Sequence, residues 1–264
     1  MMQTEEGLLS FGGHLEVLRQ MLFRILGVTF VFSCIIFCFK TKTFDILLAP
    51  SDSSFVTYRW AEKIVNYADP LFHFEPFNIE LIATDLSSQF ITHLTTSIYL
   101  GMLCASPFIM YELFRFVSPA LLENEKKYST RIVVSIYFLF VIGVLMSYYI
   151  LFPISFRFLG TYSVADKVHN MITLDSYIST FSSLTLLMGI VFQLPVISFI
   201  LAKMGILNAS QMAKYRKHAF ILIMLIAAII TPPDVMTLIF VVIPLYILFE
   251  LSITFIKKYN YGIS

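Results

Sequence analysis

Long apolar runs make up most of this chain, and short polar segments separate them. A helix needs about 20 apolar residues to cross a bilayer, and five of the runs come close to that length or exceed it. A sixth run is clearly shorter. The pattern predicts an all-α integral membrane protein with six transmembrane helices, at residues 21–39, 90–114, 132–158, 177–201, 219–230 and 235–256.

The fifth run, 219–230, has only 12 residues and by itself would indicate a re-entrant or buried segment. We interpret it as a span that is thin enough to compress the bilayer locally. In the TPPD sequence that follows, Pro232 and Pro233 end one helix, and Asp234 suits the first turn of the next. Residues 219–256 therefore predict a hairpin, and we expect these last two spans to be short.

Lysine and arginine are distributed unequally between the two sides of the predicted spans. Twelve of the 18 lie on the side of the N-terminus, and six lie on the other side. Cytoplasmic loops carry the excess of basic residues, so both termini are predicted to be cytoplasmic. The cytoplasmic loops then lie at about 115–131 and 203–218, within a single polytopic membrane domain over 1–264.

The outer side holds a long loop at about 40–85 and a shorter one that ends near Asp175, which is a predicted helix cap. Within the long loop, residues 55–68 mix aromatic and charged positions and predict an interfacial helix. The chain's one tryptophan, Trp60, suits that depth.

Composition agrees with a membrane protein. Apolar residues make up 58% of the 264, and charged residues make up 13%, about half the share that is usual in a soluble domain. The mean hydropathy is +0.82. The three cysteines lie inside apolar runs, where they indicate small hydrophobic side chains and no disulfide or zinc site.

The sequence lacks the common signatures of enzymes, such as HExxH, GxSxG or a phosphate-binding glycine loop. An intramembrane protease would need a nucleophile with its base, or a metal-binding set, and neither can be assembled. A small-solute or ion transporter remains the alternative function. It would require a polar site with paired charges near the midplane, where this chain offers chiefly Gln193.

The few polar residues inside the predicted spans are candidate sites. Arg24 lies at an inner helix end and is interpreted as a snorkelling side chain, and His93 as a satisfied polar contact. Glu250 lies one to two turns from Lys257 and Lys258, so an interfacial role and a functional role both stay open. Gln193 precedes Pro195 and is expected to bond a freed backbone carbonyl or a neighbouring helix.

The segment 118–127, SPALLENEKK, gathers charge between two apolar runs. Serine followed by proline predicts the start of a helix. Glu123 and Lys127 are four residues apart and are able to pair on a helix surface. Glu125 has no basic partner at that favourable spacing, so it is the freer carboxylate. A cytoplasmic acid among basic residues suits the docking of a basic peptide in one orientation.

Eight motifs, in order along the chain, resemble TatC, the multi-spanning receptor subunit of the twin-arginine protein translocase. The likeness runs from about residue 11 to 253. The first motif, GGHLEVLRQML, matches at His14, Leu15, Leu18 and Arg19, and LAPSD and IATD supply Pro50 and Asp85. The cytoplasmic FRFVSPALLENEKK matches at Phe116, Pro119, Ala120, Leu121, Glu125, Lys126 and Lys127. The remaining motifs are FVIGVLMSYYILFP, GIVFQLPV, ITPPDV and IPLYILFELSI, with Gly143, Pro153, Gly189, Pro195, Pro232, Pro233, Asp234, Pro244 and Glu250.

The resemblance implies a binding and assembly role without catalysis and without a cofactor. It implies recognition of folded cargo through signal peptides that carry consecutive arginines, recruitment of the single-span partners TatA and TatB, self-association in the complex, and transport that draws on the protonmotive force. Contacts with membrane lipid are implied, and nucleic acid is not a partner. The location implied is the bacterial cytoplasmic membrane, with an organellar inner membrane as the alternative.

The resemblance also assigns two sets of site residues. Glu125 is the expected main contact of the arginine pair, because carboxylates hold guanidinium groups bidentately and lysine lacks that fork. The signal-peptide set comprises Glu125, Glu16, Arg19, Phe116, Pro119 and Glu123. The polar transmembrane and partner set comprises Gln193, Pro50, Asp85, Asp234 and Glu250.

Two positions depart from the family pattern. Glu16 lies one residue before the usual glutamate, which rotates it by about 100° around a helix, and Val17 occupies the usual acidic place. Gln193 stands where a glutamate is common in the fourth span, so this site is able to form hydrogen bonds but does not titrate.

Overall fold

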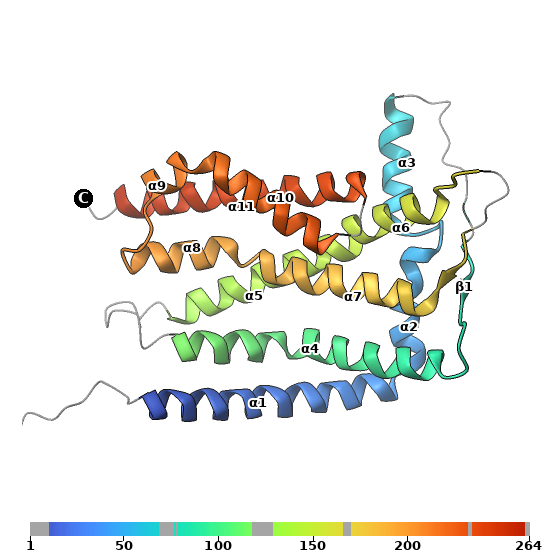
Figure 1. The fold of residues 1–264 in the computed structure, drawn as a ribbon, viewed down its shortest axis with the longest axis horizontal. Coiled ribbons are helices and arrows are strands. Elements are labelled where there is room, and N and C mark those ends of the chain that lie inside the picture. Colours follow the sequence, from blue (N-terminus) through green and yellow to red (C-terminus); the bar gives the residue numbers. More distant parts are fainter. Residues whose placement is uncertain are drawn as a thin grey trace, which may run out of the picture. The chain divides into compact units, whose positions relative to one another are not determined.

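The computed structural model describes residues 11–68, 77, 79–117, 129–165, 170–231 and 234–261, and helices account for most of them (Figure 1). In the N-terminal half the elements are α1 (Phe11–Cys38), α2 (Lys40–Leu48), the 3-10 turn η1 (Ala49–Ser51), α3 (Val56–Ala68), β1 (Leu81–Ile82) and α4 (Ser88–Val117). The C-terminal half comprises α5 (Ser129–Met146), the π-helical turn η4 (Ser147–Leu151), α6 (Phe152–Thr161), β2 (Ile172–Thr173), α7 (Leu174–Val191), α8 (Leu194–Lys203), α9 (Ala209–Lys214), α10 (Arg216–Ile230) and α11 (Val235–Tyr261).

Five helical stretches of the described chain are long and apolar enough to cross a membrane: Leu15–Cys38, Ser88–Phe116, Val133–Thr161, Leu174–Lys203 and Val235–Lys258. The remaining predicted span lies in α10, which has 15 residues and a length of about 22 Å at 1.5 Å per residue. It is short, as predicted, and it forms the expected hairpin with α11. The expectation that the last span is also short is wrong, because α11 has 27 residues. Its helix continues past the apolar run through Lys257 and Lys258.

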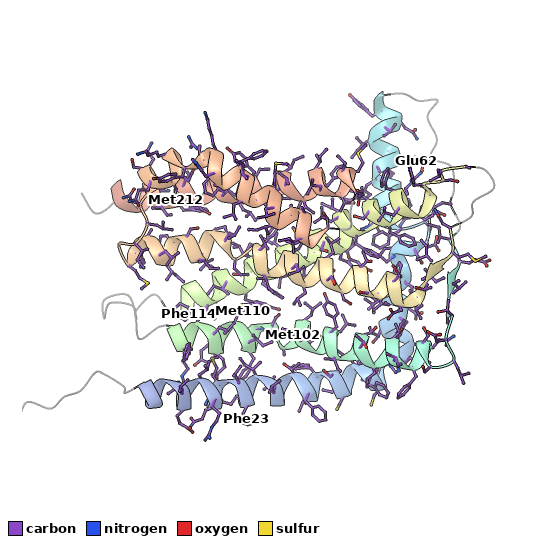
Figure 2. The ribbon with its side chains drawn as sticks, in the orientation of Figure 1. Phe23, Glu62, Met102, Met110, Phe114 and Met212 are labelled. Atoms are coloured by element: carbon purple, nitrogen blue, oxygen red, sulfur yellow. The ribbon has the colours of Figure 1, made fainter. Side chains whose placement is uncertain are left out.

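The chain divides into two compact units. The first contains residues 1–38 and 97–137, and the second contains residues 39–96 and 138–264. In the first unit, α1 and α4 cross closely, since a Cβ atom placed on Gly101 would lie 2.1 Å from the Ser33 hydroxyl oxygen. On α1, Phe23 is 68% exposed, whereas Phe114 of α4 is buried (Figure 2).

In the second unit, α5 and α7 approach each other at two glycines. A Cβ atom on Gly143 would lie 2.7 Å from the carbonyl oxygen of Met188, and one on Gly189 would lie 2.7 Å from the ring of Phe140. Neither position has room for a side chain. The next turn of the α5–α6 span is π-helical, and the buried Ser147 hydroxyl there lies 3.2 Å from that of Thr185.

Aromatic rings form the core next to this crossing. Phe152, Tyr177 and Phe181 are each at most 3% exposed, and the ring of Phe152 lies 5.0 Å from both of the others in edge-to-face geometry. The Tyr177 hydroxyl donates to the carbonyl of Leu47 at 2.8 Å. This bond joins α7 to the end of α2.

The segment between η1 and β1 contains the helix that was predicted to be interfacial, which is α3. Trp60, Ile64 and Tyr67 of α3 are exposed. Tyr58 is buried instead, and its hydroxyl lies 2.9 Å from the carbonyl oxygens of both Pro50 and Pro153. Burial raises the pKa of Tyr58, so the hydroxyl stays a donor at physiological pH.

The segments that precede α4 and α7 meet in a short parallel strand pair, in which Leu81 pairs with Ile172 and Ile82 with Thr173. Helix α7 follows β2, and its predicted cap, Asp175, is wrong by two residues. Thr173, not Asp175, accepts the peptide N–H of Ser176, and Asp175 lies in the first turn.

Candidate functional site

Of the six predicted signal-peptide residues, Glu123, Glu125 and Pro119 lie outside the described residues. Glu16 and Arg19 lie near the start of α1, and Phe116 lies at the end of α4, all in the first unit. Phe116 is half-buried there. The segment that carries Glu125 connects α4 to α5 and therefore starts one residue after α4 ends.

Glu16 and Arg19 form an ion pair with each other. Their closest atoms, Oε1 and Nη2, are 2.7 Å apart, and the amide of Gln20 donates to the same carboxylate oxygen at 3.1 Å. The side chains are 46% and 65% exposed, so the pair is accessible from the solvent. Exposed pairs of this kind contribute little to stability, which leaves the Glu16 carboxylate able to exchange Arg19 for another guanidinium group.

A second ion pair in the same unit was not predicted from the sequence. The Nη2 atom of Arg24, on α1, lies 2.8 Å from Oε2 of Glu112, on α4. The Glu112 side chain is 4% exposed and that of Arg24 is 44% exposed. Arg24 was interpreted as a snorkelling side chain, and the structure corrects this, because its guanidinium binds a buried carboxylate. Glu112 lies inside the predicted span 90–114, so an inventory of acids in spans would have found it.

The Arg24–Glu112 pair fixes how the two helices align. Glu112 is five residues from the end of α4, and Arg24 is five residues after Arg19 in α1. At 1.5 Å per residue, both intervals measure about 7.5 Å along their helices. The pair therefore brings the Glu16–Arg19 end of α1 to the same end of the unit as Phe116 (Figure 1).

The remaining predicted site residues lie in the second unit and do not form one site. Pro50 is buried in η1, where its carbonyl accepts the bond from Tyr58. Asp85 is exposed just before α4 and lines a cavity of about 540 Å³ together with Lys40 and His93. Pro50 and Asp85 belong to the part of the chain between α1 and α4.

Asp234 caps α11 as predicted. Its Oδ1 atom accepts the peptide N–H of Thr237 at 2.6 Å. The other carboxylate oxygen, Oδ2, is buried and makes no hydrogen bond to the residues that the structure describes.

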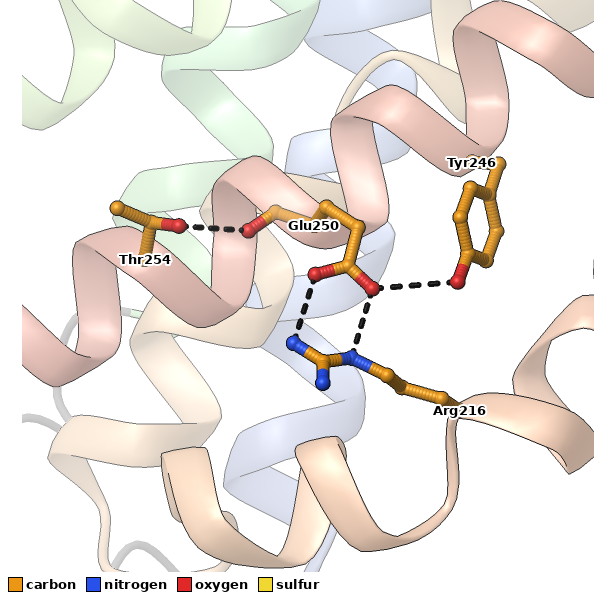
Figure 3. A network of polar contacts seen from close by, with 4 residues as sticks. All are labelled: Arg216, Tyr246, Glu250 and Thr254. Carbon is orange, nitrogen blue, oxygen red and sulfur yellow. Dashed lines mark hydrogen bonds and ion pairs between the residues drawn. The ribbon is translucent and has the colours of Figure 1, made fainter.

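Glu250 is bound by an arginine from the neighbouring helix (Figure 3). Arg216, at the first position of α10, approaches the carboxylate with Nε at 2.8 Å from Oε1 and Nη2 at 2.9 Å from Oε2. The hydroxyl of Tyr246 donates to Oε1 at 3.2 Å. The sequence pointed to Lys257 and Lys258 as neighbours of Glu250, and the structure places Arg216 there instead. Glu250 thus ties the start of α10 to the C-terminal half of α11.

Gln193 is 7% exposed and lies at the break between α7 and α8. The peptide N–H of Gln193 donates to Ile190, so the carbonyl of Gly189 loses its usual helical donor. The side-chain amide of Gln193 donates to that carbonyl at 3.4 Å. The expected bond to a freed carbonyl is confirmed.

Among the described residues, no group of three or more His, Cys, Asp or Glu side chains is placed to hold a metal ion.

Comparison with known proteins identifies the family of this fold. The family described as Sec-independent protein translocase protein (TatC) matches residues 13–244, which is most of the chain. The chain belongs to the TatC family. The TatC of Blattabacterium sp. subsp. Periplaneta americana (strain BPLAN) is 34% identical over 256 residues, 96% of each chain. The TatC of Desulforapulum autotrophicum is 35% identical over 255 residues, 96% of this chain and 86% of the relative.

A crystal structure of the twin arginine translocase receptor TatC shares the fold, with a TM-score of 0.71 and 30% identity over 93% of this chain and 98% of its own. The resemblance inferred from the eight motifs is therefore confirmed, and so is the helical membrane fold of TatC. The TatC relatives are named as translocase proteins, which describes a transport function. The Arg24–Glu112 pair, in the first unit, and the Arg216–Glu250 pair, in the second, are structural features of this TatC chain that its apolar pattern did not indicate.

Proposed function

We propose that this chain is the receptor subunit of a twin-arginine translocase, and that it binds the signal peptides of folded precursors. The observation that carries the proposal is the likeness to the solved twin arginine translocase receptor over 93% of the chain. Glu125 is the proposed main acceptor of the arginine pair, supported by the exposed Glu16–Arg19 pair and by Phe116, Pro119 and Glu123. Transport of the bound precursor draws on the protonmotive force.

The test is capture of a precursor by the purified full-length protein. A precursor with consecutive arginines and a matched precursor with consecutive lysines are each incubated with the immobilised protein. We expect the arginine form to bind and the lysine form to bind far less, because lysine has no bidentate fork. Equal capture of both forms would contradict the proposal.

We further propose that TatA- and TatB-type single-span proteins assemble with this subunit, that the subunit self-associates, and that the complex resides in the bacterial cytoplasmic membrane. The family membership and the exposed apolar helices support this proposal. The residues proposed to support partner assembly are Gln193, Pro50, Asp85, Asp234 and Glu250. Substitutions at Asp234 and Gln193 test this proposal.

The first expectation concerns orientation. In a variant that lacks Cys34, Cys38 and Cys104, a cysteine at position 63 should react with a membrane-impermeant label from outside. Lys63 is exposed on α3, so access is not limited by burial. A cysteine at position 126 should react only after permeabilisation. The reverse accessibility would overturn cytoplasmic termini and the docking proposal with them.

The second expectation concerns Asp234. Asn keeps an oxygen for the Thr237 N–H and caps helices nearly as well, so Asp234→Asn should assemble with its partners normally. Asp234→Leu loses the cap, at about 0.5–2 kcal/mol, and should assemble poorly in co-purification of the single-span partners. Failure of the asparagine variant would instead indicate a required negative charge.

The third expectation concerns Gln193. Gln193→Leu leaves the Gly189 carbonyl without its side-chain donor and should weaken co-purification of a partner helix, while precursor capture survives. Gln193→Glu should still transport, because the proposal gives this residue a hydrogen-bonding role and no proton-carrying role. Normal assembly and transport by Gln193→Leu would reduce the residue to a helix-packing amide.

A further inference from the structure

Helix α3 carries a stripe of exposed apolar side chains. Its members recur at spacings of three and four residues, so they share one side of the helix, and they are Val56, Trp60, Ile64 and Tyr67. Their exposed fractions run from 39% at Val56 to 95% at Tyr67. The part of the chain that the structure describes therefore leaves this α3 stripe largely uncovered.

The start of α3 is fixed to the α5–α6 span of the same unit. The hydroxyl of the buried Tyr58 lies 2.9 Å from the carbonyl oxygen of Pro153, and the hydroxyl of Thr57 donates to the carbonyl of Tyr149. The ring of Phe55 stacks on that of Tyr149, with 6.0 Å between their centroids. Because these contacts hold the other side of the helix, the α3 stripe cannot turn toward the core without breaking them.

The same contacts set the depth of α3 in a bilayer. The span Val133–Thr161 has 29 residues and measures about 43 Å, close to the thickness of a bilayer with its headgroups. Pro153 lies about 12 Å from the end of this span at Thr161. The start of α3 is thus held near the boundary between headgroups and acyl chains. Figure 1 shows α3 lying across the direction of α10 and α11, which belong to the same unit, so the helix runs along the bilayer surface.

The residue types of α3 suit that boundary. Tryptophan and tyrosine concentrate there because their rings are apolar and their N–H or O–H groups reach water, and the stripe contains Trp60 and Tyr67. Lys63 and Arg59 are exposed, and helical spacing places both along one edge of the stripe. Long basic side chains at this level extend to lipid phosphates. The acid of the helix, Glu62, is half-buried on the opposite side.

We propose that α3 lies in the surface of the lipid bilayer, with the α3 stripe among the first carbons of the acyl chains and with Arg59 and Lys63 at the phosphates. Lipid is the occupant because it surrounds the span at this depth and because its phosphates match the cationic edge of the stripe. Through the bonds of Thr57 and Tyr58, the buried stripe fixes the depth of the α5–α6 span relative to the headgroups. This role does not depend on the binding of signal peptides.

The experiment uses the fluorescence of Trp60, which reports on α3 alone because the chain has one tryptophan. The purified full-length protein is reconstituted into vesicles of phosphatidylcholine and phosphatidylglycerol, at a ratio of protein to lipid that makes two copies in one vesicle rare. The quenchers are phosphatidylcholine brominated near the headgroup end of its chains, phosphatidylcholine brominated near the chain ends, and iodide on both sides of the membrane. We expect quenching to be strongest with the first, weaker with the second and weakest with iodide.

Two matched variants move the tryptophan. Trp60→Phe/Ile64→Trp keeps the reporter on the α3 stripe and should show the same order of quenching. Trp60→Phe/Val164→Trp places it at an apolar position that is 83% exposed and lies outside α3, and this variant should be quenched mainly by iodide. Phenylalanine keeps an apolar side chain at position 60 in both variants, so the stripe itself is preserved.

Four results would overturn the proposal. Strongest quenching of Trp60 by iodide would place the α3 stripe in water. Protection from iodide and from both brominated lipids would show that a protein partner or a second copy covers the stripe. Strongest quenching by the lipid brominated near the chain ends would place α3 inside the hydrocarbon, below the surface. Equal lipid quenching at positions 60 and 164 would mean that any exposed tryptophan of this protein enters lipid and that the stripe has no special role.

Discussion

Replacing Glu125 with lysine is expected to abolish capture of twin-arginine precursors while the protein still inserts into the membrane. The change turns an attractive contact with two guanidinium groups into a repulsive one. Each charge-assisted hydrogen bond contributes about 1.5–3 kcal/mol, so loss of two such bonds weakens binding by roughly 100-fold or more. Insertion should survive, because position 125 lies in a polar segment between two spans.

Glu123→Lys is the matched control, with the same charge change two residues away. It should weaken capture less, because Glu123 is able to pair locally with Lys127 at the i, i+4 spacing and is the less available carboxylate. Both variants are compared with the parent protein for membrane content and for capture of the same precursor. If both captured precursor as well as the parent does, Glu125 would not be the binding residue.

The elements that the sequence predicted well depend on local signals. The α10–α11 hairpin follows from two apolar runs with prolines between them, and the Asp234 cap follows from an acid just before a helix. Helix α3 was visible in its mixed apolar and polar positions. These features need only a few neighbouring residues, so they can be read from one segment of the chain.

Boundaries were less predictable for physical reasons. The end of an apolar run limits the part of a helix inside the membrane, but polar residues continue the helix in water. Helix α11 accordingly extends to Tyr261. At the start of α7, Thr173 is held extended by its pairing in β2, so it is the last non-helical residue and takes the cap in place of Asp175.

The side-chain partners across helices could not be predicted from the pattern. Arg24 and Glu112 are 88 residues apart, and Arg216 and Glu250 are 34 apart. Which residues meet depends on how far one helix is shifted and rotated against another. That alignment is set by contacts such as Gly101 against Ser33, which a hydrophobic period does not reveal. The sequence identified Arg24 and Glu250 as unusual residues and missed the partners that explain both.

The Arg24–Glu112 pair leads to the second large expected effect, which is on stability. Arg24→Leu should be strongly destabilising, because it leaves a carboxylate that is 4% exposed without its partner. Removal of one member of a buried pair costs about 3–5 kcal/mol, and the half-exposed arginine places this pair at the lower end. Glu112→Leu should cost less, since Arg24 is 44% exposed and its charge stays hydrated. Thermal unfolding of the purified protein in detergent measures both changes.

The double variant Arg24→Leu/Glu112→Leu separates pairing from packing. Replacement of a whole buried pair by apolar residues is often nearly neutral, so the double variant should be more stable than Arg24→Leu alone, with a clear coupling energy in the double-mutant cycle. The exposed Glu16–Arg19 pair is the control, and its removal should change stability by about 1 kcal/mol or less. Additive effects at positions 24 and 112 would mean that the two residues act independently. The alignment of α1 with α4 would then rest on the Gly101–Ser33 contact, with no contribution from the ion pair.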